Sequence, residues 1–342
     1  KQRAVQAPLR LGRKRGGQGC QSGGAAADWE RFYQKYGGAI TSFARRQGCD
    51  DHAALDALEE LDAADGDHEG LLQVLKRKTE FATTPLARIH LLLRQADIAE
   101  NELHQPDLAI EAYEHVMQES ERGEAFEPLE RLYTQRKRWV DLGFLYERAL
   151  DVGLGDPRDI RHKLAVVFLE HRNAPDEGMD HFSRLLEQAP DYTPSIDYLE
   201  NLVRQGSHVG LAAGLLEPIL LVKLEWERLV QVMQAHCNAE TDPDERMRLL
   251  ERLAETYEDH LEDLDGAMST YARMFRLDPS NEHANEALVR LARVLDRWEQ
   301  LALIYEDVLQ ELSNEDLAAE LALLAARIRV QRGLVADTTV NL

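Results

Sequence analysis

The 342-residue chain is 44% hydrophobic but only 6% aromatic, and Leu, Ala, Glu and Arg dominate it, so its composition predicts an all-α protein. The formal net charge of −22 is unevenly spread: residues 1–46 hold ten Lys or Arg against two acidic residues, a net of +8, which leaves −30 for the rest. Phosphate groups bind to basic surfaces, so this acidity argues against nucleic acid as a ligand of residues 53–330.

The cysteines and the apolar runs limit the cellular setting. Cys20, Cys49 and Cys237 form no CxxC pair, which argues against a disulfide framework or a zinc ribbon and favours a reducing compartment. The most apolar run, residues 210–224, is interrupted by two charged residues and a proline, so no membrane span is predicted. We expect a cytoplasmic protein, although a first residue other than Met leaves a removed targeting segment open.

Two segments precede the repeated part of the chain. Residues 1–27 are basic and rich in Gly, which predicts a disordered tail, with an arm for nucleic acid or an anionic surface as the alternative. Residues 28–52 are rich in aromatic side chains such as Trp29 and Tyr33, and we expect them to form a capping helix region over the first hairpin. This stretch also resembles the opening helix of region 2 in extracytoplasmic-function sigma factors. The acidic promoter-melting helix that should follow is replaced by the repeat pattern.

Residues 243–279 predict an antiparallel pair of helices. Leu250, Leu253, Ala254 and Tyr257 follow the i, i+3, i+4, i+7 spacing of an amphipathic helix. A short polar turn and a second amphipathic run follow, and a proline ends the second run. We interpret this stretch as one helical hairpin.

The same hairpin recurs upstream at residues 87–116 and 161–190. In all three copies the last apolar anchor of the first helix precedes the small residue of the second helix by ten positions. The start of the downstream copy is marked by Asp242, which can cap the helix, and by Pro243, which suits the first helical position. A constant interval in every copy indicates a true repeat.

A second kind of hairpin alternates with the first. Residues 127–150 match residues 286–309, and in each a Trp precedes a Tyr by seven positions. Residues 56–79 fit the same frame, and Trp226 marks a further copy. The position that Trp139 occupies is taken by His68, Trp139, Trp226 and Trp298 in the successive copies, and these residues are 71, 87 and 72 positions apart. The middle interval is longer by about one helix, which matches an extra apolar segment at residues 209–222.

A helix–turn–helix unit of about 34 residues, with small residues where the helices approach, resembles the tetratricopeptide repeat. The resemblance covers residues 53–330 and implies an α–α superhelix in which each hairpin packs on its neighbours. Residues 331–342 are expected to be a tail that follows a truncated repeat. The framework positions of the clearest copy are Leu250, Leu253, Ala254, Tyr257, Ala267, Tyr271 and Pro279.

The sequence carries none of the common catalytic motifs. The sequence contains no HExxH, no GxxxxGK[ST], no GxSxG and no GxGxxG after a strand. Its twelve histidines are scattered at spacings that do not suit chelation from one helical face. We therefore expect a protein that is not an enzyme and that has no catalytic, cofactor or metal site.

The predicted function is a non-catalytic scaffold or adaptor that binds a partner protein or peptide. The resemblance implies a concave surface built from the first helix of each hairpin, and the acidic charge favours a basic or amphipathic segment as the ligand. The alternative is that these charges only keep the surface soluble. The partner-binding candidates are the exposed positions of two first helices: Arg248, Glu251, Glu255, Glu258, Glu286, Arg290 and Arg293.

The last predicted helix, residues 317–330, has no second helix after it. Its apolar stripe of Leu321, Leu324 and Ile328 is in register with first helices that are covered elsewhere. A bare stripe of this kind favours self-association or a longer natural repeat array.

Two other functions stay open. The chain can be a fragment of a transcription regulator in which a sigma-like N-terminal helix precedes a repeat sensor. It can also be an assembly or accessory subunit whose repeats hold an enzyme complex together.

Overall fold

The computed structural model describes residues 55–331 apart from residues 57, 60, 61, 64, 65, 121 and 313. The described residues form fifteen α-helices and one π-helical turn, and they contain no strand. The prediction of an all-α repeat array is therefore confirmed. The predicted tail and capping region, residues 1–27 and 28–52, lie outside the described residues, as do residues 332–342.

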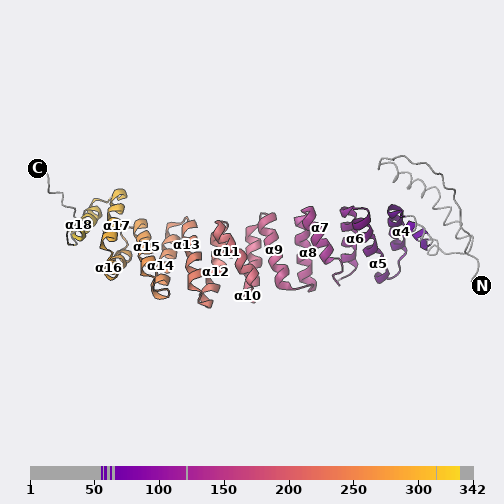
Figure 1. The fold of residues 1–342 in the computed structure, drawn as a ribbon, viewed down its shortest axis with the longest axis horizontal. Coiled ribbons are helices and arrows are strands. Elements are labelled where there is room, and N and C mark those ends of the chain that lie inside the picture. Colours follow the sequence, from indigo (N-terminus) through magenta and orange to yellow (C-terminus); the bar gives the residue numbers. More distant parts are fainter. Residues whose placement is uncertain are drawn as a thin grey trace, which may run out of the picture. The chain divides into compact units, whose positions relative to one another are not determined.

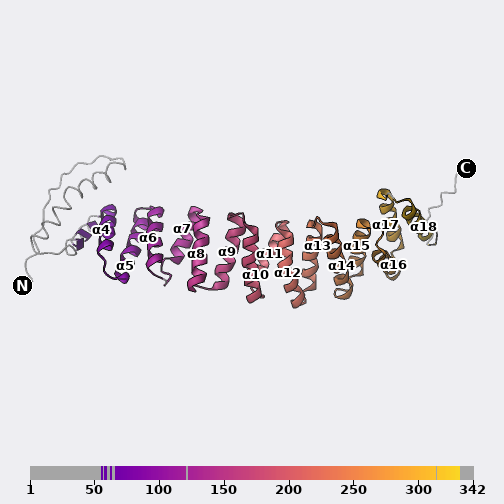
Figure 2. The ribbon, with the colours of Figure 1, turned by 180° about the vertical axis from the view of Figure 1, so that it is seen from behind.

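The chain divides into two compact units, residues 1–145 and 146–342. Figures 1 and 2 show the helices following one another as antiparallel neighbours within each unit. The described helices of the first unit are α4 (His68–Phe81), α5 (Pro85–Asp97) with its π-helical extension η2 (Ile98–Glu102), α6 (Pro106–Glu119) and α7 (Phe126–Arg136). Helix α8 (Trp139–Val152) crosses the boundary between the units.

The second unit holds the longer run of helices. Its helices are α9 (Pro157–His171), α10 (Pro175–Gln188), α11 (Thr193–Gln205), α12 (Val209–Lys223), α13 (Trp226–Ala239), α14 (Pro243–Asp259), α15 (Leu264–Leu277), α16 (Glu282–Leu295), α17 (Trp298–Glu311) and α18 (Glu315–Gln331).

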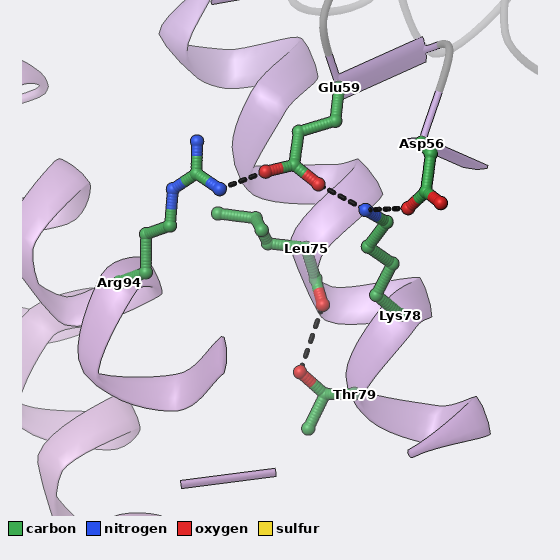
Figure 3. Close-up of polar contacts among 6 residues, drawn as sticks. All are labelled: Asp56, Glu59, Leu75, Lys78, Thr79 and Arg94. Atoms are coloured by element: carbon green, nitrogen blue, oxygen red, sulfur yellow. Dashed lines mark hydrogen bonds and ion pairs between the residues drawn. The ribbon is translucent and has the colours of Figure 1, made fainter. Parts of the chain in front are cut away.

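An ion-pair cluster joins the residues before α4 to the first two described helices (Figure 3). Glu59 contacts both Lys78 of α4 and Arg94 of α5, and Lys78 also contacts Asp56 at 2.5 Å. The Thr79 hydroxyl donates to the Leu75 carbonyl at 2.9 Å, within the same turn of α4. The Glu59 side chain is only 15% exposed, so solvent screens its pairs with Lys78 and Arg94 less than it screens pairs between fully exposed side chains.

Local sequence signals set the ends of the predicted hairpin. Helix α14 begins at Pro243, and the Asp242 side chain accepts a hydrogen bond from the Asp244 amide at 3.1 Å. Helix α15 begins after Asp263, which accepts from the Gly266 amide at 2.9 Å. Each acceptor satisfies an amide that has no partner within its own helix.

The core lies between the paired helices, where the repeat pattern placed it. In α14 and α15, Leu253, Ala254 and Ala267 are fully buried, and Tyr271 is 3% exposed. An added Cβ at Gly266 would lie 2.8 Å from Tyr257 Cδ1, which shows how closely the helices approach at the turn. The six predicted framework residues from Leu250 to Tyr271 are therefore core residues, whereas Pro279 is only partly buried.

Side chains join many helices of the second unit to the helix two positions further along the chain, and these helices form two rows. One row contains α9, α11, α13, α15 and α17, and the other contains α10, α12, α14 and α16. The joining pairs are Tyr198–Glu170, Arg228–Glu200, Arg273–Asn238 and Arg276–Asp307 in the first row, and Arg252–Glu217 and Arg290–Glu258 in the second.

The extra apolar segment predicted at residues 209–222 is helix α12, and it changes the row in which first helices lie. Three helices, α11 to α13, separate the hairpin α9–α10 from the hairpin α14–α15. A regular array would have one hairpin of two helices between them. The first helices α9 and α11 therefore lie in one row, and the first helices α14 and α16 lie in the other. A face built only from first helices does not continue past α12.

The apolar stripe of α18 is not bare, which corrects a premise of the sequence analysis. Leu321 is 2% exposed, and Leu324 and Ile328 pack against the same core, because α18 folds back onto α17. Arg329 Nη2 also donates to Glu306 Oε2 of α17 at 2.7 Å. The structure therefore gives no support to self-association through these three apolar residues.

Candidate functional site

The seven predicted partner-binding residues lie on α14 and α16, which are neighbours in one row. The structure brings two of them together: Arg290 Nη2 lies 2.8 Å from Glu258 Oε2, and the Glu258 side chain is only 15% exposed. Arg248 pairs instead with Glu245 of its own helix at 2.8 Å. Glu251, Glu255, Glu286 and Arg293 are exposed.

A groove of about 530 Å³ lies between α12 and α14, with α13 as its floor. Its α12 wall consists of residues spaced i, i+3, i+4, i+7, which places them on one side of that helix. Glu255 is the only one of the seven predicted residues that lines it. The lining residues are Gly214, Glu217, Pro218 and Leu221 of α12, Leu229, Met233 and His236 of α13, and Glu245, Leu249, Arg252, Glu255, Thr256, Asp259 and His260 at the α14 side.

The base of the groove is held by a buried carboxylate. Glu217 Oε1 lies 2.9 Å from His236 Nδ1, and Arg252 Nη2 donates to Glu217 Oε2 at 2.9 Å. Burial alone would raise the pKa of Glu217, but the hydrogen bonds from both partners and the charge of Arg252 outweigh burial and lower it. Glu217 is therefore ionised at neutral pH, and it ties all three helices of the groove together.

The α14 wall carries uncompensated negative charge. Glu217 is neutralised by Arg252, and Glu245 has Arg248 beside it, whereas Glu255 and Asp259 have no ion-pair partner among the described residues. A cation from another molecule can therefore pair with this wall without displacing an existing partner. A second hollow, between α15 and α17, differs in this respect because its charged side chains are already paired with one another or with α18.

The α12 wall offers an exposed backbone acceptor. Pro218 has no amide hydrogen, so the Gly214 carbonyl, four residues earlier, lacks its usual helical donor. Gly214 itself has open space around it, since no atom lies within 4 Å of an ideal Cβ at this position. A donor group on a ligand can reach this carbonyl.

Apolar side chains are exposed at the C-terminal end of α12, and of these Leu221 lines the groove. Leu221 is 49% exposed, and Val222 and Leu224 at the end of α12 are 82% and 64% exposed. At the α14 end, the His260 ring stacks on Trp226 with centroids 3.8 Å apart and planes 4° from parallel. The groove thus combines one apolar wall with one acidic wall.

Sequence reasoning found this site only in part. The Gly and Pro four residues apart in α12, and an apolar segment that did not fit the repeat, were the available signals. The contact between Glu217 and Arg252 joins residues 35 positions apart, and no repeat pattern predicts it.

The described residues offer little other chemistry. No three His, Cys, Asp or Glu side chains gather there closely enough to hold a metal ion. Cys237 is fully buried, and burial raises the pKa of its thiol to about 11, so it is a poor nucleophile at neutral pH. No described helix is both long and apolar enough to cross a bilayer.

Comparison with known proteins gives structural likeness alone. No family model matches the sequence, and no curated protein does. A tetratricopeptide repeat protein from Parabacteroides merdae is 13% identical and covers 80% of this chain and 97% of its own, with a TM-score of 0.29. Naa15/Naa10 bound to HypK-THB is 16% identical over 89% of this chain and 49% of that chain, with a TM-score of 0.31. The TPR2AB domain of yeast Sti1 in complex with pHSP90 is 14% identical over 80% of this chain and 96% of that chain, with a TM-score of 0.27.

Proposed function

We propose that this protein is a non-catalytic scaffold that binds a partner protein through a basic, amphipathic segment seated in the groove between α12 and α14. The observation that carries the proposal is the pairing of uncompensated Glu255 and Asp259 on one wall with exposed Leu221 on the other. A segment with cations on one side and apolar residues on the other satisfies both walls at once.

The groove also limits the affinity that such a segment can have. The ion pairs form at a partly exposed wall, so they contribute modestly and weaken as salt screens them. Burial of one or two apolar side chains of the ligand contributes about 1.5–3 kcal/mol each. After the entropic cost of association, we expect micromolar binding.

A fluorescein-labelled peptide of alternating Leu and Lys provides the test, read by anisotropy with the full chain. We expect the affinity to fall with added salt and to fall about tenfold in Glu255→Lys, which replaces attraction by repulsion. The matched control is Glu320→Lys, which changes an exposed glutamate of α18 far from the lining residues and should bind as the unchanged protein does. An equal loss in both variants would show non-specific charge attraction and refute the groove as the site.

The accessory-subunit alternative uses the same groove and differs only in the nature of the partner. A catalytic protein that co-purifies with the unchanged chain and with Glu320→Lys, but not with Glu255→Lys, would identify this alternative. The transcription-regulator alternative depends on residues 28–52, which lie outside the described residues.

A further inference from the structure

We propose that a small hollow at the end of the hairpin α14–α15, away from its turn, binds a phosphate group carried by a phosphorylated side chain of a partner protein. The hollow has a volume of about 210 Å³. No residue lines both this hollow and the groove between α12 and α14, so the inference goes beyond the proposed function. The lining residues are Arg246 and Leu250 of α14 and Arg273, Arg276 and Leu277 of α15.

Three arginines meet at this hollow because α14 and α15 are antiparallel neighbours. Arg246 lies in the first turn of α14, and Arg273 lies about one turn before the end of α15. Arg276 follows Arg273 by three positions, which places both on one side of α15. Among the described residues, the charged side chains that line the hollow are therefore all cationic.

Two of these cations are held by neutral acceptors. Arg246 Nε donates to the Glu240 carbonyl at 3.0 Å, and Arg273 Nη2 donates to Asn238 Oδ1 at 2.7 Å. Among the described residues neither arginine pairs with a carboxylate, and both are partly buried. Burial reduces screening by solvent, so an anion that reaches these two charges is attracted more strongly than it would be by fully exposed arginines.

The number of free donors favours a phosphate over a carboxylate. Arg276 uses Nε for its pair with Asp307 at 2.7 Å, and a guanidinium group has five N–H donors, so all three arginines keep donors for a further anion. A phosphorylated side chain carries a charge of about −1.5 to −2 and three strong acceptor oxygens, and it can accept from all three guanidinium groups at once. The volume of the hollow is several times the roughly 30 Å³ that one water takes up in the liquid.

The charge of the surrounding chain decides which class of molecule carries the phosphate. The chain has a formal net charge of −22, and α14 itself holds six acidic residues against three Arg. A nucleic acid would bring many further phosphates against this acidic surface. A polypeptide with one phosphorylated residue brings a single phosphate, and an apolar side chain next to it can contact Leu277, which is only partly buried.

Fluorescence anisotropy with the full chain provides the test. The probe is a fluorescein-labelled peptide, Gly-Ala-Leu-phosphoserine-Leu-Ala-Gly, and the comparison peptides carry Ser or Glu in place of phosphoserine. We expect the phosphopeptide to bind about tenfold more tightly than either comparison peptide. Arg273→Gln removes one of the three cations and should weaken the phosphopeptide about tenfold. The matched control is Arg327→Gln, which removes an exposed arginine of α18 outside the lining residues and should bind as the unchanged protein does.

Hydrogen exchange of the unchanged protein locates the site without any substitution. The phosphopeptide should slow exchange in peptides that contain the start of α14 and the end of α15, and the Ser peptide should not. This measurement decides the location even if Arg273→Gln lowers the stability of the hairpin. Protection that appears only in other helices would overturn the proposed site.

The remaining outcomes each decide one part of the inference. Equal affinity for the phosphopeptide and the Ser peptide, or an equal loss in the two Arg variants, would overturn the phosphate site. Free phosphoserine that binds as tightly as the peptide would overturn the assignment to a partner protein. A short oligothymidylate that binds more tightly than the phosphopeptide, and that Arg273→Gln weakens, would overturn it in favour of nucleic acid. None of these results bears on the groove between α12 and α14, which the Leu–Lys peptide tests with its own variants.

Discussion

The same substitution should have opposite effects at two glycines inside helices of the second unit. An ideal Cβ at Gly178 of α10 would lie 2.8 Å from Leu169 Cγ and 2.9 Å from the Ala165 carbonyl oxygen of α9. No atom lies within 4 Å of the same position at Gly214 of α12. Gly178→Ala and Gly214→Ala therefore share the change in helix propensity and differ in packing alone.

The magnitudes follow from these distances. Replacing Gly by Ala in a helix interior contributes about 1 kcal/mol of stability. At Gly214 that gain should appear in full. At Gly178 the new methyl group meets a backbone oxygen that cannot rotate away, and overpacking of this kind costs about 1–3 kcal/mol. We expect Gly178→Ala to be destabilising by about 1 kcal/mol and the two variants to differ by about 1–3 kcal/mol.

Hydrogen exchange read by mass spectrometry is the suitable assay, because repeat arrays open locally. Peptides of α9 and α10 should lose protection in Gly178→Ala, and peptides of α12 should gain protection in Gly214→Ala. Urea unfolding followed by circular dichroism gives the total change. If Gly178→Ala stabilises the protein as much as Gly214→Ala does, α9 and α10 do not approach as closely as the hairpin requires, and the packing argument is wrong.

Three further results are expected. Ala254 is fully buried, so Ala254→Trp should overpack its contact and destabilise the hairpin by about 1–3 kcal/mol. Hydrogen exchange should then be faster in α14 and α15 and unchanged in α5 and α6, whereas a uniform loss of protection along the chain would contradict local packing. The pKa of Glu217 is lower in the folded protein than in the unfolded chain, so its stabilisation is present above the ordinary carboxyl pKa and is lost as the pH falls through the folded value. In Glu217→Gln, the protection of α12 amides from hydrogen exchange should therefore fall less as the pH is lowered. An unchanged dependence on acidic pH would show that the Glu217 carboxylate does not stabilise α12. Because burial raises the pKa of Cys237 to about 11, iodoacetamide at pH 8 should leave this thiol unmodified until urea is added, as mass spectrometry of its peptide would show.

The hairpins could be predicted from sequence because their determinants are local. The start of α14 was predicted from Asp242 and Pro243, and both lie where expected. The anchors Ala254 and Ala267 repeat at a constant interval because each copy buries the same contact between two consecutive helices. A repeated pattern of this kind indicates which side chains pack between two helices that are consecutive in the chain, and the core lies between such helices.

The groove could not be predicted because it depends on helices that are not consecutive. In the sequence, Glu217 is a charged residue within an apolar run. No residue near it in the sequence indicates that its side chain pairs with Arg252, which lies two helices later. The stripe of Leu321, Leu324 and Ile328 was interpreted as bare for a related reason. The sequence shows that no helix follows α18, but it does not show that α18 packs on the helix before it.

The inserted helix and the groove are one feature of the fold. A single extra helix moves every later hairpin to the opposite row, so α12, which has no counterpart in the other repeats, becomes the row neighbour of the first helix α14. Here Gly214 and Pro218 leave the α12 side open, while α14 keeps the charged exposed positions of an ordinary first helix. An apolar wall therefore faces an acidic wall across the groove between α12 and α14.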